Sequence, residues 1–198
     1  LPLKQEDVTG MGVGGLLMEI VSRPQPREPQ VSAGAGVAAI ILAAGQSRRM
    51  GGPNKLLARF EGQPLVQEKS QFQDIKIFDS KRNGRVLVLD DIVQLTTRDE
   101  CGYSEMLTHV PMLEHGRVKQ VLIAGGGDMA IAEEALKHRG VDSVFNVEID
   151  PKVVDLSRQH LAEVNAAAFA DERLKVQIED AFVFLGDKAN RHRFDLII

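Results

Sequence analysis

The feature that most constrains the fold is an alternation of short apolar runs with helical stretches, which begins at Lys119 and continues to the end of the chain. The apolar runs predict strands at 121–124, 143–149, 174–178 and 194–198. The stretches between them predict helices at 129–138, 151–164 and 181–186. Because parallel strands need crossover connections, this rhythm predicts an α/β fold built on a parallel sheet with right-handed connections.

Glycines and carboxylates follow the predicted strands. In open α/β sheets, ligands bind beyond the carboxyl ends of the strands. The residues at these ends are Gly125, Gly126, Gly127, Asp128, Glu148 with Asp150, and Glu179 with Asp180, and all but Asp150 and Glu179 are candidate binding residues. Glu148 lies about 20 residues after the glycine turn, where dinucleotide-binding units carry the acidic residue that grips ribose hydroxyls. The spacing therefore predicts a nucleoside pocket, with a plain tight turn and a solvated strand end as the alternatives.

The identity of the nucleoside depends on Asp128. Residues 125–130 fit the loose G-x-G-x-x-G/A pattern, so NAD is one candidate. Asp128, however, lies where a pyrophosphate would sit, and like charges repel. A carboxylate in this loop favours a cationic ligand such as an S-adenosyl compound. Asp180, after the third strand, is placed to accept a hydrogen bond from an adenine amino group.

The chain before the parallel sheet has a different character. Residues 72–78 alternate apolar and polar, and residues 85–89 and 92–95 are β-rich runs on either side of Asp90 and Asp91, which predicts a hairpin. A helix is expected at 103–113. Residues 1–36 are rich in Pro and Gly and read as a linker or disordered segment. We therefore divide the chain into 1–36, 37–66, 67–115 and 116–198.

An ordered set of segments from about residue 67 to residue 198 resembles the spermidine synthase family. The matching segments are 72–75, 84–90, 93–96, 98–100, Tyr103, 105–111, 121–123, 125–128 and 147–150. The resemblance implies a Rossmann-like, methyltransferase-like parallel sheet, truncated here and preceded by a small β-hairpin region. It also implies transfer of the aminopropyl group of decarboxylated S-adenosylmethionine to putrescine, which gives spermidine and methylthioadenosine. No cofactor beyond this co-substrate is implied.

The same resemblance assigns roles to particular residues. Gln73, Glu148 and Asp180 would hold the nucleoside, with Ala181 beside the adenine, and Asp128 would hold the aminopropyl amine. Tyr103 is the catalytic candidate and would line, with Gln94, the region where the substrates meet. Ser104 stands at a polyamine-contacting position. An amine attacks the carbon beside a sulfonium, so the site must position two cations and remove a proton.

The sequence departs from the family pattern at several positions. Met129 stands where a Gly is common and is expected to crowd the ligand, Ser104 replaces a His or Gln, and Ala181 replaces a Gly. The sequence ends at Ile198, before the loop whose Asp supplies the catalytic base in the family. We therefore expect little or no turnover from this chain. A non-catalytic module that binds S-adenosyl compounds and an S-adenosylmethionine methyltransferase are the alternatives.

A second motif lies at residues 42–57, within the 37–66 segment. It resembles the opening of molybdenum cofactor cytidylyl- and nucleotidyltransferases and forms a βα fragment. The resemblance implies that Gly45, Arg49 and Lys55 face phosphate groups. The alternative without a function is a basic turn exposed to solvent. A lone βα fragment cannot bury both faces of its strand, so it should be disordered or attach to another sheet edge. A nucleotidyltransferase is the resulting alternative function.

Composition excludes several classes of partner. The net charge of −4 argues against nucleic acid. The longest apolar run, 37–44, is too short to cross a membrane. With one cysteine, Cys101, no internal disulfide forms, which favours the cytoplasm. The histidines lack metal-ligand spacing, so no metal site is expected. The expected partners are putrescine and decarboxylated S-adenosylmethionine, and a homo-oligomer is left open.

Overall fold

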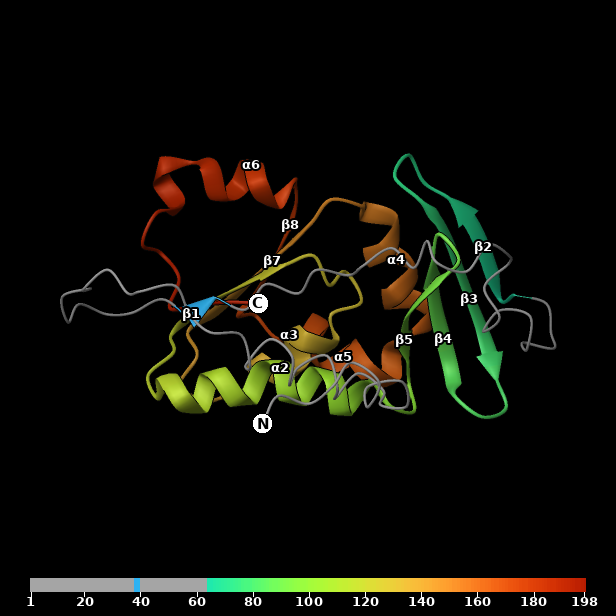
Figure 1. Cartoon of the computed structure of the whole chain (residues 1–198), viewed down its shortest axis with the longest axis horizontal. Coiled ribbons are helices and arrows are strands. Elements are labelled where there is room, and N and C mark those ends of the chain that lie inside the picture. The colour runs from blue at the N-terminus through green and yellow to red at the C-terminus, as the bar shows by residue number, and fades with distance from the viewer. Residues whose placement is uncertain (1–37, 40–63) are drawn as a thin grey trace, which may run out of the picture. The chain divides into compact units, whose positions relative to one another are not determined.

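The computed structural model describes residues 38–39 and 64–198, and these all belong to one unit that spans 36–198 (Figure 1). The predictions for residues 1–36 lie outside the described residues. So does the predicted nucleotide loop with Gly45, Arg49 and Lys55.

The centre of the unit is a five-stranded parallel sheet with the strand order β1-β9-β6-β7-β8. Its strands are β1 (Ala38–Ala39), β6 (Gln120–Ala124), β7 (Ser143–Glu148), β8 (Leu174–Ile178) and β9 (Leu196–Ile197). The last four occupy the ranges that the βαβ rhythm predicts, so the expected Rossmann-like sheet is confirmed. Ala38 and Ala39 pair in parallel with Leu196 and Ile197, so these two residues do attach to a sheet edge.

A second sheet of four antiparallel strands precedes it in the sequence. It contains β2 (Val66–Lys69), β3 (Asp74–Ser80), β4 (Gly84–Leu89) and β5 (Ile92–Thr96) in sequential order. Asp90 and Asp91, between β4 and β5, both have positive φ angles, of 46° and 63°. Such angles are typical of the two-residue turn that matches the twist of a hairpin, and Asp tolerates them better than most residues. The predicted hairpin is confirmed.

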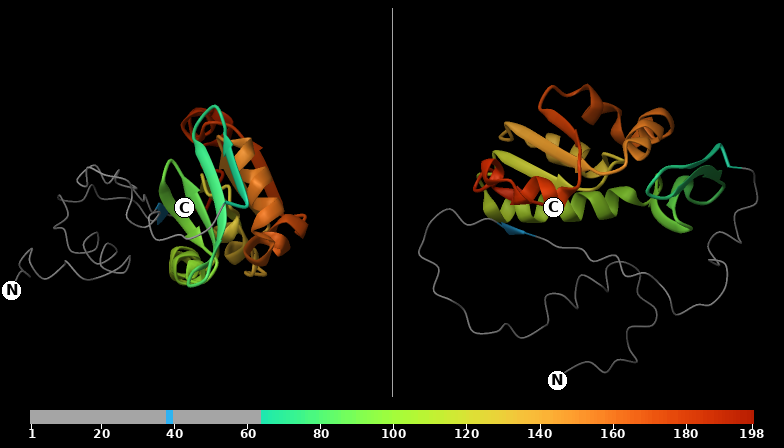
Figure 2. Two further views of the ribbon diagram at one scale, coloured as in Figure 1. Left: turned by 90° about the vertical axis from the view of Figure 1, so that its right-hand side faces the viewer. Right: turned by 90° about the horizontal axis from the view of Figure 1, so that it is seen from above.

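Helices cover both faces of the parallel sheet (Figures 1 and 2). They are α2 (Glu100–His115), α3 (Ala130–Leu136), α4 (Pro151–His160), α5 (Ala162–Ala170), α6 (Ala181–Gly186) and the short 3₁₀ helix η3 (Lys188–Asn190). Alternate residues of β6 face opposite sides. Val121 and Ile123 pack with residues of α2, α3 and α5, whereas Leu122 packs with Phe184 of α6. This period of two explains why the strands are apolar throughout.

The predicted helix at 151–164 is wrong in its extent, because the structure has two helices there. α4 ends at His160, and α5 begins at Ala162 and runs to Ala170. Between them Leu161 has a non-helical ψ of 29°, and its side chain is fully buried. The break turns Leu161 into a core that it shares with Val153 and Leu156 of α4.

That same core joins α4 to the small antiparallel sheet. Ile75, Ile77 and Leu87 of this sheet are almost completely buried and pack in one cluster with Val153 and Leu156 of α4. Burial of each such side chain contributes about 1.5–3 kcal/mol. The small antiparallel sheet is therefore held against the parallel-sheet domain by an apolar core. This core positions the turn between β2 and β3 near the start of α4.

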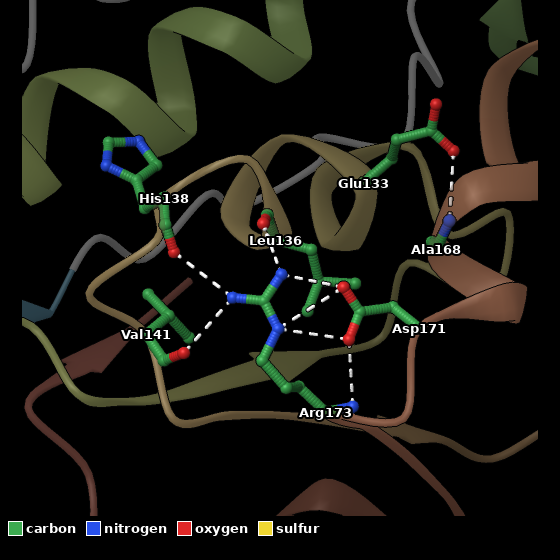
Figure 3. A network of polar contacts seen from close by, with 7 residues as sticks. All are labelled: Glu133, Leu136, His138, Val141, Ala168, Asp171 and Arg173. Atoms are coloured by element: carbon green, nitrogen blue, oxygen red, sulfur yellow. Dashed lines mark hydrogen bonds and ion pairs between the residues drawn. The ribbon is translucent and has the colours of Figure 1, made fainter.

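The loop between α3 and β7 is tied to β8 by Arg173 (Figure 3). Its Nη1 donates to the carbonyls of His138 and Val141, and its Nη2 donates to that of Leu136 at 2.6 Å. Nε and Nη2 also donate to the carboxylate of Asp171. All five N–H groups of the guanidinium are thus used, and the carbonyls of Leu136, His138 and Val141, at and beyond the end of α3, gain donors.

None of the helices in residues 64–198 has the length and apolar character that crossing a membrane requires.

Candidate functional site

The turn after β6 is built on backbone geometry that favours glycine. Gly125 and Gly126 have φ angles of 89° and 68°. Gly125 N donates to Val147 O at 2.8 Å, which ties the turn to β7. Nδ2 of the buried Asn146 on β7 donates to Gly125 O at 2.9 Å. The turn is therefore held in one conformation at the carboxyl end of the sheet, as the sequence pattern predicts.

Glu148 lies directly against this turn. Gly127 N donates to Glu148 Oε2 at 3.0 Å, and Asp150 N donates to Glu148 Oε1 at 3.0 Å. A Cβ atom at position 127 would lie only 2.9 Å from Glu148 Cγ, so glycine is required there by close approach. Each carboxylate oxygen has a further lone pair. Glu148 can thus accept two more hydrogen bonds, which suits a pair of neighbouring hydroxyl groups.

Asp128 lies two residues before the start of α3 and is half-buried. Its Oδ1 accepts from Ala130 N at 2.9 Å, and its backbone carbonyl accepts from Nδ2 of Asn165 on α5. Burial raises the pKa of Asp128. The pKa of Tyr103 is raised too, first by burial and then by the negative charge of Asp128. The structure therefore places the charge of Asp128 close enough to Tyr103 to raise the pKa of its hydroxyl group.

Met129 does not crowd the site, so that expectation is wrong. Its backbone is left-handed, with a φ of 66°, which turns the side chain away from the loop surface. The side chain is fully buried and packs in the core with Val121 and Ile123 of β6.

Asp180 lies at the end of the neighbouring strand. β7 pairs with β8 up to Glu148 and Ile178, and Glu179 N donates to Glu148 O at 3.0 Å. Asp180 Oδ1 accepts from Phe182 N at 2.7 Å and so caps α6, which begins at Ala181. The second oxygen of Asp180 is left for a ligand at the same edge of the sheet as Glu148.

Gln73 reaches this edge from the small sheet. Its Nε2 donates to Oδ2 of Asp150 at 2.9 Å, and Asp150 itself bonds to Glu148. Five predicted residues or groups therefore gather at the carboxyl edge: Gln73, the turn 125–127, Asp128, Glu148 and Asp180 with Ala181.

Two other predicted site residues, Ser104 and Gln94, do not join this group at the carboxyl edge. Ser104 is buried and forms a side-chain hydrogen bond with Glu100. Gln94 is exposed on β5 and donates to Ile92 O at 3.3 Å. Among the described residues, Gln94 makes no polar contact with another candidate.

Two supporting residues were not recognised as part of the site from the sequence. Asn146 holds the backbone of the glycine turn, and Asn165 holds the backbone carbonyl of Asp128. Asp150 was expected at this edge beside Glu148, but its bond to Gln73 was not. Asn146 carries a usable signal, because an amide in the middle of an otherwise apolar strand needs a buried partner. Asn165 is an amide in an alanine-rich helix, which is the same kind of signal.

The raised pKa values predict how the stability of the chain without ligand depends on pH. Burial is the main cause that raises the pKa of Glu100, Asp128 and Glu148, so the folded chain binds these protons more tightly than the unfolded chain. These three carboxyls should therefore add stability as the pH falls from about 7 to about 5, while the pKa of His138, which burial lowers, acts in the opposite direction. Below about 4 the stability should fall, because arginine partners lower the pKa of Asp79 and Asp171.

Thermal unfolding midpoints measured across this pH range check the prediction. Glu148→Gln removes one of the three raised carboxyls, so it should make the gain in stability between about pH 7 and about pH 5 smaller. A difference between the midpoints of Glu148→Gln and the wild-type chain that stays constant between about pH 7 and about pH 5 would contradict the prediction.

Comparison with known proteins matches almost all of the described residues to one family. The Spermine/spermidine synthase domain matches residues 100–198, and the Spermidine synthase tetramerisation domain matches residues 63–97. The MobA-like NTP transferase domain matches residues 39–70, which largely coincides with the predicted nucleotidyltransferase-like fragment.

Individual relatives agree with this match. The chain is 47% identical to a polyamine aminopropyltransferase of Serratia proteamaculans over 68% of this chain and 46% of the relative, and 50% identical to one of a Ruegeria species over 66% and 45%. Spermidine synthase from Thermotoga maritima is 36% identical with a TM-score of 0.65, over 68% of this chain and 46% of that one. A spermidine synthase in complex with the transition state analogue AdoDATO is 38% identical with a TM-score of 0.57, over 59% and 39%. The chain thus spans about half the length of the curated relatives it matches.

Proposed function

The chain belongs to the spermine/spermidine synthase family, and from this membership we propose that the protein transfers an aminopropyl group from decarboxylated S-adenosylmethionine to putrescine. The observation that carries the proposal is the placement of Glu148 against the Gly127 backbone, with Asp128 in the loop just before α3. Two acceptor oxygens for ribose hydroxyls then lie beside a carboxylate for a cationic chain.

The chemistry asked of these residues is positioning. The putrescine nitrogen forms a bond to the carbon beside the sulfonium, the carbon–sulfur bond breaks, methylthioadenosine leaves, and the attacking amine gives up a proton to a base. Asp128 would hold the amine of the aminopropyl group by a charge-assisted hydrogen bond, and Glu148 would hold the ribose. Tyr103, whose pKa is raised by burial and by the charge of Asp128, stays protonated and can orient the reacting amine. Asp180 would accept from the adenine amino group.

Calorimetric titration of the chain with methylthioadenosine tests the nucleoside part of this proposal. We expect saturable binding that is tighter than binding of S-adenosylmethionine, because the carboxylate of the latter would meet Asp128. Formation of spermidine from the two substrates tests transfer itself. Binding without transfer would favour a non-catalytic module, and a preference for S-adenosylmethionine would favour a methyltransferase. Binding only of CTP with Mg²⁺ would favour a nucleotidyltransferase and overturn the proposal.

We also propose that the protein self-associates through residues 63–97 and acts in the reducing cytoplasm. The match of this segment to a tetramerisation domain supports the first point, as do the exposed side chains of Leu65, Phe72 and Ile92. The free and exposed Cys101 is in keeping with the second. Light scattering on the eluted protein gives the mass in solution, and a monomer at all concentrations would contradict self-association.

A further inference from the structure

The turn between β2 and β3 is docked onto the start of α4 through a single carboxylate. Oδ2 of Asp150 accepts from Ser70 Oγ at 2.6 Å and from Gln73 Nε2 at 2.9 Å. Its Oδ1 accepts from Lys152 N at 3.0 Å and caps α4. Asp150 is fully buried. Its partners Ser70 and Gln73 lie far from it in the sequence. A buried charge is retained only where its hydrogen bonds are satisfied, as they are here.

This contact fixes which end of the Gln73 amide is free. A carboxylate accepts hydrogen bonds and does not donate them, so the NH₂ group of Gln73 must face Asp150. The carbonyl oxygen Oε1 is then the end that remains for a ligand. Asp150 N also donates to Oε1 of Glu148, so the same residue connects Gln73 to the acceptor that lies against the glycine turn.

We propose that Asp150 is a positioning residue that sets the hydrogen-bonding polarity of the nucleoside site. It holds Gln73 with its acceptor end toward the ligand, so that Gln73 and Glu148 together recognise a ligand that offers donors, such as the hydroxyl groups of a ribonucleoside. The inference rests on the proposed function, because it assumes that a nucleoside occupies this edge of the sheet.

A second link allows the role to be tested without undocking the turn. Lys152 on α4 forms an ion pair with Glu68 on β2, and the apolar core of Ile75, Ile77 and Val153 lies between the same segments. The turn therefore keeps its place when the two hydrogen bonds to Asp150 Oδ2, from Ser70 and Gln73, are changed.

Asp150→Asn reverses the polarity while it keeps the helix cap, because Asn caps helices as well as Asp does. With the Asn oxygen on Lys152 N, its NH₂ group faces the turn, and Gln73 must rotate to offer its carbonyl. The NH₂ group of Gln73 then faces the ligand. We expect methylthioadenosine to bind about 10-fold more weakly, since donor would meet donor.

The double variant Asp150→Asn with Gln73→Glu is the decisive comparison. One oxygen of the new carboxylate accepts from Asn, and the other again faces the ligand as an acceptor, so affinity should return to near the wild-type value. Glu68→Gln is the matched control: it removes the ion pair with Lys152, the other polar link between the same segments, and leaves the bond from Gln73 to Asp150 in place, so affinity should hold. An unchanged affinity in Asp150→Asn, or a double variant that binds no better than the single one, would overturn the inference.

A ligand-free measurement separates this inference from the proposed function. The side-chain NH₂ protons of Gln73, assigned by their loss in Gln73→Ala, should be shifted and protected from exchange in the wild-type NMR spectrum and lose both properties in Asp150→Asn. If the wild-type chain does not bind methylthioadenosine, the proposed function fails, and these signals still decide the orientation of Gln73. If the side-chain NH₂ protons of Gln73 exchange freely in the wild-type chain, Asp150 does not position Gln73, and the inference is refuted.

Discussion

Replacing Arg173 by methionine is expected to lower the free energy of unfolding by about 3 kcal/mol, which is at the high end for a single substitution. The guanidinium supplies hydrogen bonds to Asp171 and to the carbonyls of Leu136, His138 and Val141. Methionine has a similar length but no donor, so the half-buried carboxylate and these carbonyls would lose their partner. Each buried acceptor left without a partner costs about 1–3 kcal/mol, and partial access of water reduces the sum.

Urea denaturation followed by circular dichroism measures this change. Arg191→Met is the matched control, because Arg191 is exposed and its side chain makes no hydrogen bond or ion pair within the described part of the chain. Its effect should stay within about 0.5 kcal/mol. Arg173→Lys should recover little, since a lysine cannot reach the carboxylate and the separate carbonyls together. Equal stability of Arg173→Met and the wild-type chain would show that the network contributes nothing.

Replacing Gly127 by alanine is expected to weaken methylthioadenosine binding by about 100-fold and to lower stability by about 2 kcal/mol. The added methyl group would lie 2.9 Å from Glu148 Cγ and 3.0 Å from both Glu148 Oε2 and Val153 Cγ1. Glu148 would have to move, and its hydrogen bond from Gly127 N would be lost. The ribose would then lose the acceptor that is proposed to hold it.

Gly140→Ala provides the comparison for this variant. A Cβ atom at Gly140 would meet no heavy atom within 4 Å, so binding and stability should stay close to those of the wild-type chain. Calorimetry gives the affinities, and thermal unfolding gives the stabilities. A Gly127→Ala chain that binds methylthioadenosine normally would mean that Glu148 does not hold the nucleoside.

Local patterns predicted the parts of the fold that depend on neighbours in the sequence. The alternation of apolar runs and helical stretches located β6, β7 and β8, and the Asp90-Asp91 pair located the β4–β5 turn. The break at Leu161 was not predicted, because residues 151–170 contain neither Gly nor Pro after the first helical position. That break depends on burial of Leu161 against the small sheet, which is a tertiary effect.

In the candidate site, too, features that depend on sequence neighbours were predicted and features that depend on tertiary packing were not. Glu148 and the glycine turn were predicted because their spacing is set by one βαβ unit. The bond from Gln73 to Asp150 joins the turn before β3 to the start of α4, 77 residues apart in the sequence, so no spacing rule could reveal it. The left-handed backbone at Met129 was also unforeseen, since only the packed core shows why a methionine is tolerated there.

Met129 has a consequence for how this position can change over generations. A glycine would adopt the left-handed backbone without strain, but it would also empty the space that the methionine side chain fills among Val121, Ile123 and their neighbours. Relief of strain is worth about 1–3 kcal/mol, and the cavity costs about 2–5 kcal/mol, so the exchange is unfavourable unless a neighbour grows in the same step. Position 129 is therefore epistatic with its core contacts: the residue that suits one genetic background is a defect in another.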